Sequence, residues 1–444
     1  MRTRTMKQQV LLALCATSLG LGACGLDVPN LNNPSLESFQ ERPTPAAIYS
    51  ASTGLLIGNR AGVSAQAGYV AQLGILGRES FTLDAADPRY VTEMVRGNLD
   101  PGSPAFGGSN WANPYANIRN ANTLLAALDK VNGVSDAQKE AIQGFAKTIQ
   151  ALDFLVVINT RDTNGAPINV GGLITEPLGE IESKEAVFAH IVTLLEEAKG
   201  HLNAGGDAFP FPLSSGYTGF NKPKDFLKFN RALAARVYVY RGDFNAALTA
   251  LGESFLDTTK PLTLGVYHTF STGPGDVPNA LKNDNIYANP TLRTDADLKA
   301  NGAIDDRVTR KTASADETKY DDNLKSDLVF TLYDSQSTPV PIIRNEELIL
   351  LRAEANIGLR NYGPATEDIN FIRTTSGGLE PRTDLGEANI LDELLKQKRY
   401  SLLFEGGHRW IDMRRYGKLD QLDKAGGIIH DKFPLPKSET DARQ

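Results

Sequence analysis

Residues 399–417 read Arg-Tyr-Ser-Leu-Leu-Phe-Glu-Gly-Gly-His-Arg-Trp-Ile-Asp-Met-Arg-Arg-Tyr-Gly, the strongest-looking constellation of chemically active side chains in the sequence. Glu405 and Asp412 could form a general acid/base pair with His408 beside them. Alternatively, the acids and arginines form buried, charge-assisted hydrogen bonds that lock two helices together. Asp412 could then pair with Arg409 or accept backbone donors. We favour the structural role for the residues of this motif, namely Arg399, Glu405, His408, Arg409, Trp410, Asp412 and Arg414.

Apolar residues recur at helical spacing on the N-terminal side of the motif and into it. From this spacing we predict helices over 224–241, 345–359 and 388–404. Another helix opens with Ser135 and Gln138, which is the pattern of a capping box. Trp111 belongs to a further apolar stripe, so a core position is favoured for its ring.

Long stretches rich in Gly, Pro and Asn separate the helical blocks, at 78–113, 160–182, 203–223 and 258–342. Loops of this length inside a compact protein are usually functional or disordered. Short β segments fit within 258–342, but no sustained alternation is visible there. Residues 162–165, Asp-Thr-Asn-Gly, resemble the start of a calcium loop but lack its downstream Glu, so we predict a plain turn.

Two helix pairs repeat one spacing, in which a small residue precedes an aromatic residue by nine positions and an alanine follows three later. The copies are Ala235, Phe244 and Ala247, and Ala353, Tyr362 and Ala365. This is the spacing of a tetratricopeptide unit, where small residues let two helices approach and the aromatic ring fills the gap at their turn. The second copy is partial, because Asn356 stands where an aromatic residue is usual. One such pair could be ordinary hairpin packing, but two copies favour a repeat.

The N-terminus has the features of an export signal. Three cations within residues 1–7 precede an apolar stretch over 10–21, and residues 21–24 read Leu-Gly-Ala-Cys. This is the pattern of a secretory signal, and it is too short to span a bilayer. Its end also resembles the lipobox of bacterial lipoproteins, which predicts a cut after residue 23. An ordinary cleaved signal with a chance cysteine is the alternative.

The lipobox predicts that Cys24 carries the lipid. Residues 25–45 are rich in Asn, Pro and other polar residues, so we predict a flexible, extended tether over 24–45. Cys15 lies in the leader, so the mature chain would have no free thiol. This excludes a disulfide framework, a thiolate metal site and a cysteine nucleophile. No later segment is expected to be long and apolar enough to cross a membrane.

The net charge of the chain restricts the classes of ligand that it can bind. Removal of the leader leaves 43 basic against 53 acidic residues, which changes the net charge from −7 to −10. An acidic chain argues against nucleic acid as a partner, and it suits an uncharged ligand better than an acidic one. The five histidines never approach metal-ligand spacing, and we expect neither a metal nor another cofactor.

Six stretches together resemble the SusD/RagB family of outer-membrane nutrient-binding lipoproteins. They are residues 24–34, 111–125, 144–154, 339–355, the motif at 399–417 and the closing 433–439. The chain departs from the family pattern at 159–165, where members often carry an aromatic, glycine-rich turn. It also lacks, after Cys24, the acidic run that is linked with surface display in some relatives.

The resemblance implies a mainly α, SusD-like fold with about four tetratricopeptide-like helix pairs, long irregular loops and minor β structure. It implies one helical domain over 46–444, and no enzymatic activity. It further implies a lipid-anchored outer-membrane protein, facing the cell surface, that captures a glycan or other small nutrient. A SusC-like TonB-dependent transporter would be its partner and would import that nutrient.

Sugar binding calls for aromatic faces flanked by polar groups, and exposed loops are where such groups stand. Candidate ligand contacts in the loops 78–113 and 258–342 are Phe81, Asp84, Arg89, Tyr90, Tyr267, His268, Phe270 and Tyr287. Two other functions stay open. The repeat spacing fits a periplasm-facing scaffold that binds proteins, and the many carboxylates leave room for a glycoside hydrolase.

Overall fold

The computed structural model describes residues 36–103, 108–171, 177–321 and 323–444. The predicted signal peptide at 1–23, Cys24 and the first part of the predicted tether lie outside the described residues. Helix α2 (Leu36–Glu41) occupies the later part of the tether. The expectation of an extended chain is therefore wrong for this segment, because Phe39 packs against the main hydrophobic core.

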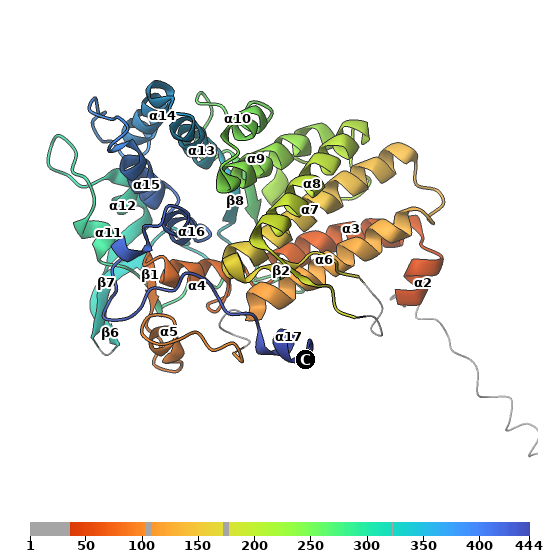
Figure 1. Cartoon of the computed structure of the whole chain (residues 1–444), viewed down its shortest axis with the longest axis horizontal. Coiled ribbons are helices and arrows are strands. Elements are labelled where there is room, and N and C mark those ends of the chain that lie inside the picture. The colour runs from red at the N-terminus through yellow and green to blue at the C-terminus, as the bar shows by residue number, and fades with distance from the viewer. Residues whose placement is uncertain (1–35, 104–107, 172–176, 322) are drawn as a thin grey trace, which may run out of the picture.

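Within the described residues, eight helices form four packed pairs, which confirms the predicted mainly α fold. The pairs are α3 (Pro45–Arg60) with α6 (Ser109–Leu128), α7 (Asp136–Arg161) with α8 (Lys184–Ala204), α9 (Pro223–Arg241) with α10 (Phe244–Gly252), and α13 (Asn345–Gly358) with α14 (Tyr362–Thr375). Figure 1 shows them following one another from the right of the molecule to its upper left as one helical layer.

Helix α7 passes through the main hydrophobic core. The Gln138 amide N–H donates to the Ser135 hydroxyl at 3.3 Å, and the Ser135 N–H donates to the Gln138 side chain at 3.0 Å, which confirms the predicted capping box. The segment 136–164 is long and apolar enough to cross a membrane, so our expectation that no such segment follows the leader is wrong. However, 83% of its most apolar window is buried inside the protein, as expected of a core helix.

The two copies of the repeat spacing form the helical hairpins α9–α10 and α13–α14, which pack against each other. Gly242 turns the first hairpin in the left-handed conformation, with φ of 79°. The ring of Phe244 then fills the space between the hairpins, since a Cβ atom on Gly358 would lie only 2.1 Å from its Cε2 atom. The aromatic residue at the turn therefore joins two successive pairs.

Short strands and helices make up the other part of the molecule, at the left of Figure 1. A four-stranded antiparallel sheet has the order β1 (Ser80–Thr82), β5 (Ile286–Ala288), β7 (Leu324–Phe330) and β6 (Thr312–Asp321). Two strands of ten and seven residues thus lie where we saw no sustained alternation. The pattern is hidden because β6 is an exposed edge strand, and because β7 buries Ser326, whose hydroxyl donates to the Ala288 carbonyl at 2.7 Å.

Further α-helices and strand pairs complete the described part of the molecule. They are α4 (Tyr69–Leu76), α5 (Arg89–Thr92), α11 (Thr291–Thr294), α12 (Asp306–Lys311), α15 (Ile390–Ser401), α16 (His408–Arg415), α17 (Lys437–Asp441), and the strand pairs β2 (Ala166–Pro167) with β3 (Ile181–Glu182) and β4 (Gly265–His268) with β8 (Val340–Arg344). The predicted helix 388–404 ends early, at Ser401. Positive φ angles at Phe404, Gly406 and Gly407 turn the chain there before α16 begins.

Candidate functional site

Ion pairs hold the motif at 399–417 inside the protein. Arg344 donates through Nε to Glu405 Oε2 at 2.7 Å, and Lys311 donates through Nζ to Oε1 at 3.0 Å. Burial would raise the pKa of Glu405, but Arg344 and Lys311 outweigh burial and hold this pKa below its usual value. Glu405 is therefore a fixed anion that ties α12 and β8 to the turn before α16.

Asp412 is held in the same way. Lys398 Nζ lies 2.6 Å and Arg415 Nη1 lies 3.0 Å from its carboxylate oxygens. Both cations also contact Glu354, at 2.8 and 2.9 Å, and all four side chains are nearly inaccessible to solvent. The partners of Asp412 are thus Lys398 and Arg415 rather than Arg409. Because both carboxylates are buried in ion pairs, neither Asp412 nor Glu405 is free for acid/base chemistry.

The other motif residues also contact protein groups. Trp410 is fully buried and donates through Nε1 to the His430 carbonyl at 2.7 Å. Arg414 donates to the carbonyls of Asn159 and Asp431, and Arg399 to Asp295, each at 2.8 Å. Burial lowers the pKa values of His408 and Arg409. Arg414 also lies 3.3 Å from Asp162, which Lys184 contacts at 2.5 Å, so the turn at 162–165 is held by cations of the chain itself.

Three of the eight candidate ligand contacts are unavailable to a ligand, contrary to our expectation. Phe81, Tyr90 and Phe270 are each at most 6% exposed and belong to hydrophobic clusters. The physical reason is that the two long loops are folded into β1, α5 and the β4 region and build small cores of their own. Their aromatic side chains fill these cores.

Two further candidates lie near the surface but pair locally. Gln66 donates through Nε2 to Asp84 at 2.7 Å, and Arg89 contacts Asp87 at 2.8 Å. The last three candidates line cavities: Tyr267 and His268 line one, His268 also lines a smaller one of about 60 Å³ beside Glu405 and His408, and Tyr287 lines another. The structure therefore places Tyr287 in a different hollow from Tyr267 and His268.

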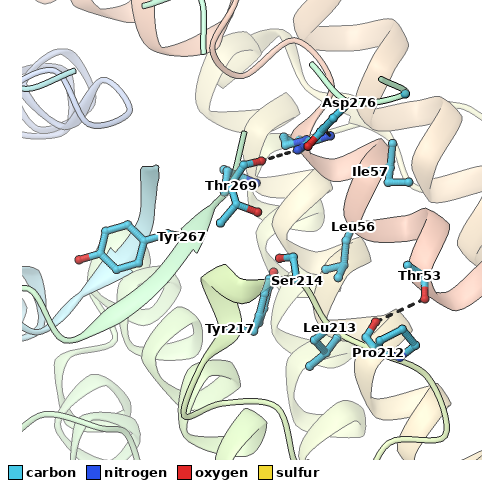
Figure 2. Close-up of a pocket in the computed structure, with 13 residues that line it drawn as sticks. Thr53, Leu56, Ile57, Pro212, Leu213, Ser214, Tyr217, Tyr267, Thr269 and Asp276 are labelled. Atoms are coloured by element: carbon cyan, nitrogen blue, oxygen red, sulfur yellow. Dashed lines mark hydrogen bonds and ion pairs between the residues drawn. The ribbon is translucent and has the colours of Figure 1, made fainter. Parts of the chain in front are cut away.

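The first hollow, here named the α3 groove, has a volume of about 350 Å³. Its lining comes from Thr53, Leu56, Ile57 and Arg60 of α3, from residues 212–214 and 217, and from 267–269, 275 and 276. Figure 2 shows these three segments around the opening. Among the described lining residues, the charged side chains are Arg60 and Asp276, and they neutralise each other because they lie 2.5 Å apart.

The α3 groove offers little to a sugar ring. In Figure 2 the ring of Tyr267 extends away from Leu56 and Ile57, on the other side of its strand, and its hydroxyl donates to the Thr263 carbonyl. Tyr217 is buried and stacks on Phe226, with ring centroids 5.9 Å apart. Burial lowers the pKa of His268 to about 3, so this imidazole is neutral. The groove is an aliphatic surface without an accessible aromatic face among its described lining residues.

The second hollow, here named the sheet groove, has a volume of about 550 Å³ and lies over β5, β6 and β7. Tyr287 and Phe330 are half-buried and contribute aromatic rings, while Tyr333 forms part of its floor. The polar lining residues are Lys282, Asn283, Asp284, Ser314, Asp316 and Glu317. Aromatic faces beside carboxylate and amide groups are the combination that a carbohydrate requires.

A large irregularity in β6 shapes the sheet groove. Ser314 pairs with Leu328 and Lys319 pairs with Ser326, so four residues of β6 face one residue of β7. Such bulges redirect side chains and are common beside functional sites. Here the bulged residues include Asp316 and Glu317, which line the groove.

The aromatic residues of the sheet groove rest on the motif at 399–417. Phe330 stacks on the buried Phe404 with ring centroids 4.3 Å apart and nearly parallel planes. Tyr333 donates its hydroxyl to the Phe404 carbonyl at 2.9 Å. The motif therefore positions the groove, although its charged side chains do not line it.

The two predicted loop regions meet beside this groove. Phe81 of β1 pairs with Tyr287 of β5, and Gln66 links Asp84 to Asn283 by side-chain hydrogen bonds of 2.7 and 2.6 Å. Sequence reasoning missed Asn283, Asp316, Glu317 and Phe330. Neither strand is marked in the sequence: the alternation of β7 is hidden by the buried Ser326, and no local pattern indicates the bulge in β6.

Among the described residues, no group of three or more His, Cys, Asp or Glu side chains is arranged to hold a metal ion. What the sheet groove offers chemically is therefore hydrogen bonding, stacking and charge.

A model of the SusD family matches residues 319–439. Similar solved structures include a SusD superfamily protein from Bacteroides vulgatus, which is 14% identical with a TM-score of 0.68 over 89% of this chain and 96% of that chain. A SusD-like carbohydrate-binding protein from Bacteroides fragilis is 15% identical, with a TM-score of 0.68 over 87% and 88% of the two chains. A laminarin-binding SusD-like protein is 19% identical, with a TM-score of 0.64 over 90% and 98%. No curated protein sequence matches the chain.

Proposed function

The chain belongs to the SusD/RagB family, and from this premise we propose that it is a carbohydrate-binding protein that holds an oligosaccharide in the sheet groove. The observation that carries the proposal is the pair of half-buried rings, Tyr287 and Phe330, in one open groove with carboxylate and amide groups. Sugar C–H faces stack on such rings, while hydroxyl groups donate to the carboxylates. The volume of about 550 Å³ gives room for more than one sugar ring.

Binding without turnover is the activity we propose, since the family consists of non-catalytic binding proteins. The buried and paired state of Glu405 and Asp412 agrees with this, because a hydrolase needs two carboxylates that reach the glycosidic bond.

Calorimetry against a panel of oligosaccharides tests the proposal, and the panel begins with laminarin fragments because one relative is described as laminarin-binding. Tyr287→Ala is expected to weaken binding at least tenfold, the effect of a well-placed aromatic anchor. Tyr320→Ala is the matched control, since this tyrosine of the same sheet, in β6, is 65% exposed and does not line the groove. Equal affinity for Tyr287→Ala and wild type would exclude the sheet groove.

We further propose that Cys24 anchors the protein to the outer membrane and that a SusC-like TonB-dependent transporter receives its ligand. Support comes from the lipobox-like Leu-Gly-Ala-Cys at 21–24 and from the family. Affinity capture of the lipidated protein from detergent-solubilised membranes should recover an outer-membrane β-barrel. Cys24→Ala is expected to be released from the membrane fraction, and recovery of soluble partners alone would contradict delivery to a transporter.

A last part of the proposal is that residues 46–444 act as one domain. Helix α13 packs against α9, α10 and α15, and so links the helical layer to the motif at 399–417. We expect a single unfolding transition followed equally by far-UV circular dichroism and by tryptophan fluorescence. Two separate transitions would show independent domains.

A further inference from the structure

We infer that the sheet groove excludes anionic glycans and selects neutral or amino-sugar oligosaccharides. This inference rests on the proposed function and concerns the chemical class of its ligand.

The lining of the groove is unbalanced in charge. Asp284, Asp316 and Glu317 are exposed, and none of them forms an ion pair with another described residue. Lys282 is the single cation among the described lining residues. The groove therefore presents three free carboxylates against one ammonium group.

Arg293, which contacts a lining residue, does not correct this imbalance of charge. Arg293 of α11 donates to the Ser314 hydroxyl at 3.2 Å, and its guanidinium also lies 3.6 Å from Asp327. Its charge is thus shared with an acid outside the groove. Recognition of a uronic acid or a sulfate ester usually employs the planar fork of an arginine, and no arginine lines the groove within the described residues.

Electrostatics then separate three classes of sugar. A carboxylate or sulfate entering the groove meets a local excess of two negative charges, and the net negative charge of the chain adds to the repulsion. Because these acids are exposed, solvent weakens each interaction, and like charges a few ångströms apart in such a setting still lower affinity severalfold. Neutral hydroxyl groups suffer no such loss. A protonated amino group gains attraction from the same carboxylates.

The decisive experiment compares three forms of one ligand. A neutral oligosaccharide that binds in the panel is converted into its C6 carboxylate and, separately, into its 6-amino-6-deoxy derivative. In 20 mM salt at pH 7, we expect the carboxylate form to bind about tenfold more weakly than its neutral parent, and the amine form at least as tightly.

Two double variants test whether the difference in affinity between the ligand forms arises in the sheet groove. We call the ratio of the affinities for the neutral and carboxylate forms the affinity gap. The double variant Asp316→Asn/Glu317→Gln is expected to reduce this gap at least threefold. Glu185→Gln/Asp207→Asn changes the net charge equally on exposed sites at α8 and just after it, and should leave the gap unchanged.

The outcomes separate the two proposals. If no oligosaccharide binds, both the proposed function and this inference are overturned. If a neutral ligand binds and its carboxylate form binds equally well or better, the inference alone fails. It also fails if the groove variant and the α8 variant change the gap by the same factor.

Discussion

The motif at 399–417 and the sheet groove both gather carboxylates, but they hold them in opposite ways. Glu405 and Asp412 are buried, and each lies within 3.0 Å of two cations. Asp316 and Glu317 are exposed and form no ion pair with another described residue. A buried charge must be neutralised by its surroundings, whereas an exposed charge stays available to a ligand. The densest group of charged residues in the sequence therefore belongs to the scaffold, and the proposed ligand surface is a different region of the molecule.

A Glu→Ala substitution should change the free energy of unfolding far more in the motif than in the sheet groove, and this is the largest difference we expect. Glu405→Ala leaves Arg344 and Lys311 buried without their shared anion, so we expect the free energy of unfolding to fall by about 3–5 kcal/mol. Glu317→Ala should change it by less than about 0.5 kcal/mol. Urea denaturation of both variants measures the difference, and equal losses would erase the distinction between scaffold and groove.

Asp153 provides a third setting, because it is buried and no cation among the described residues pairs with it. Its carboxylate accepts hydrogen bonds from Asn59 and Asn117, both at 2.7 Å. Burial raises its pKa to about 8, although the two amides act in the opposite direction. Here neutralisation comes from a proton rather than from an ion pair.

This proton predicts a dependence on pH. Between the unfolded pKa near 4 and the folded pKa of about 8, the folded protein binds one more proton than the unfolded chain, so stability falls as pH rises. One group contributes at most about 1.4 kcal/mol per pH unit in this window. Urea denaturation at pH 5 and pH 7 should show a smaller decline for Asp153→Asn than for wild type. Parallel declines would mean that Asp153 is ionised in the folded state.

Packing between helix pairs provides the next smaller effect. Gly358→Ala would place a methyl group against the ring of Phe244, and we expect a loss of about 1–3 kcal/mol from overpacking. Gly363→Ala is the control, because open space surrounds that position in α14 and alanine favours a helix. Thermal unfolding of both variants distinguishes the two, and an unaffected Gly358→Ala would contradict the contact between hairpins.

The features that could be predicted from the sequence are those that depend on residues close together in the chain. The capping box at Ser135, the helix over 224–241 and the repeat spacing around Phe244 depend on residues close together in the chain, and all appear in the structure. The sheet groove instead depends on the pairing of β1, β5, β6 and β7, which are brought together from distant segments. No local pattern encodes such pairing.

The incorrect ligand candidates have the same origin. Phe81, Tyr90 and Phe270 lie in stretches rich in Gly and Pro, which suggested exposed loops, yet tertiary packing buries all three. Tyr287 lies in the same kind of stretch but stays half-buried beside the groove. Composition alone could not separate them, because burial depends on which strand lies opposite.

The smallest expected effect tests whether the edge of the groove is built by contacts between the two long loops. Gln66 accepts from the Asn283 side chain at 2.6 Å and donates to Asp84 at 2.7 Å, so it fixes a lining residue without lining the groove itself. We expect Gln66→Ala to weaken oligosaccharide binding about fivefold, since one neutral hydrogen bond contributes about 1 kcal/mol. Calorimetry with the ligand used for Tyr287→Ala measures this change. Gln66→Glu should weaken binding further, because a carboxylate cannot donate to Asp84 and would face it as a like charge. An unchanged affinity in both variants would show that the position of Asn283 does not matter to the ligand, and the groove would then begin at β5.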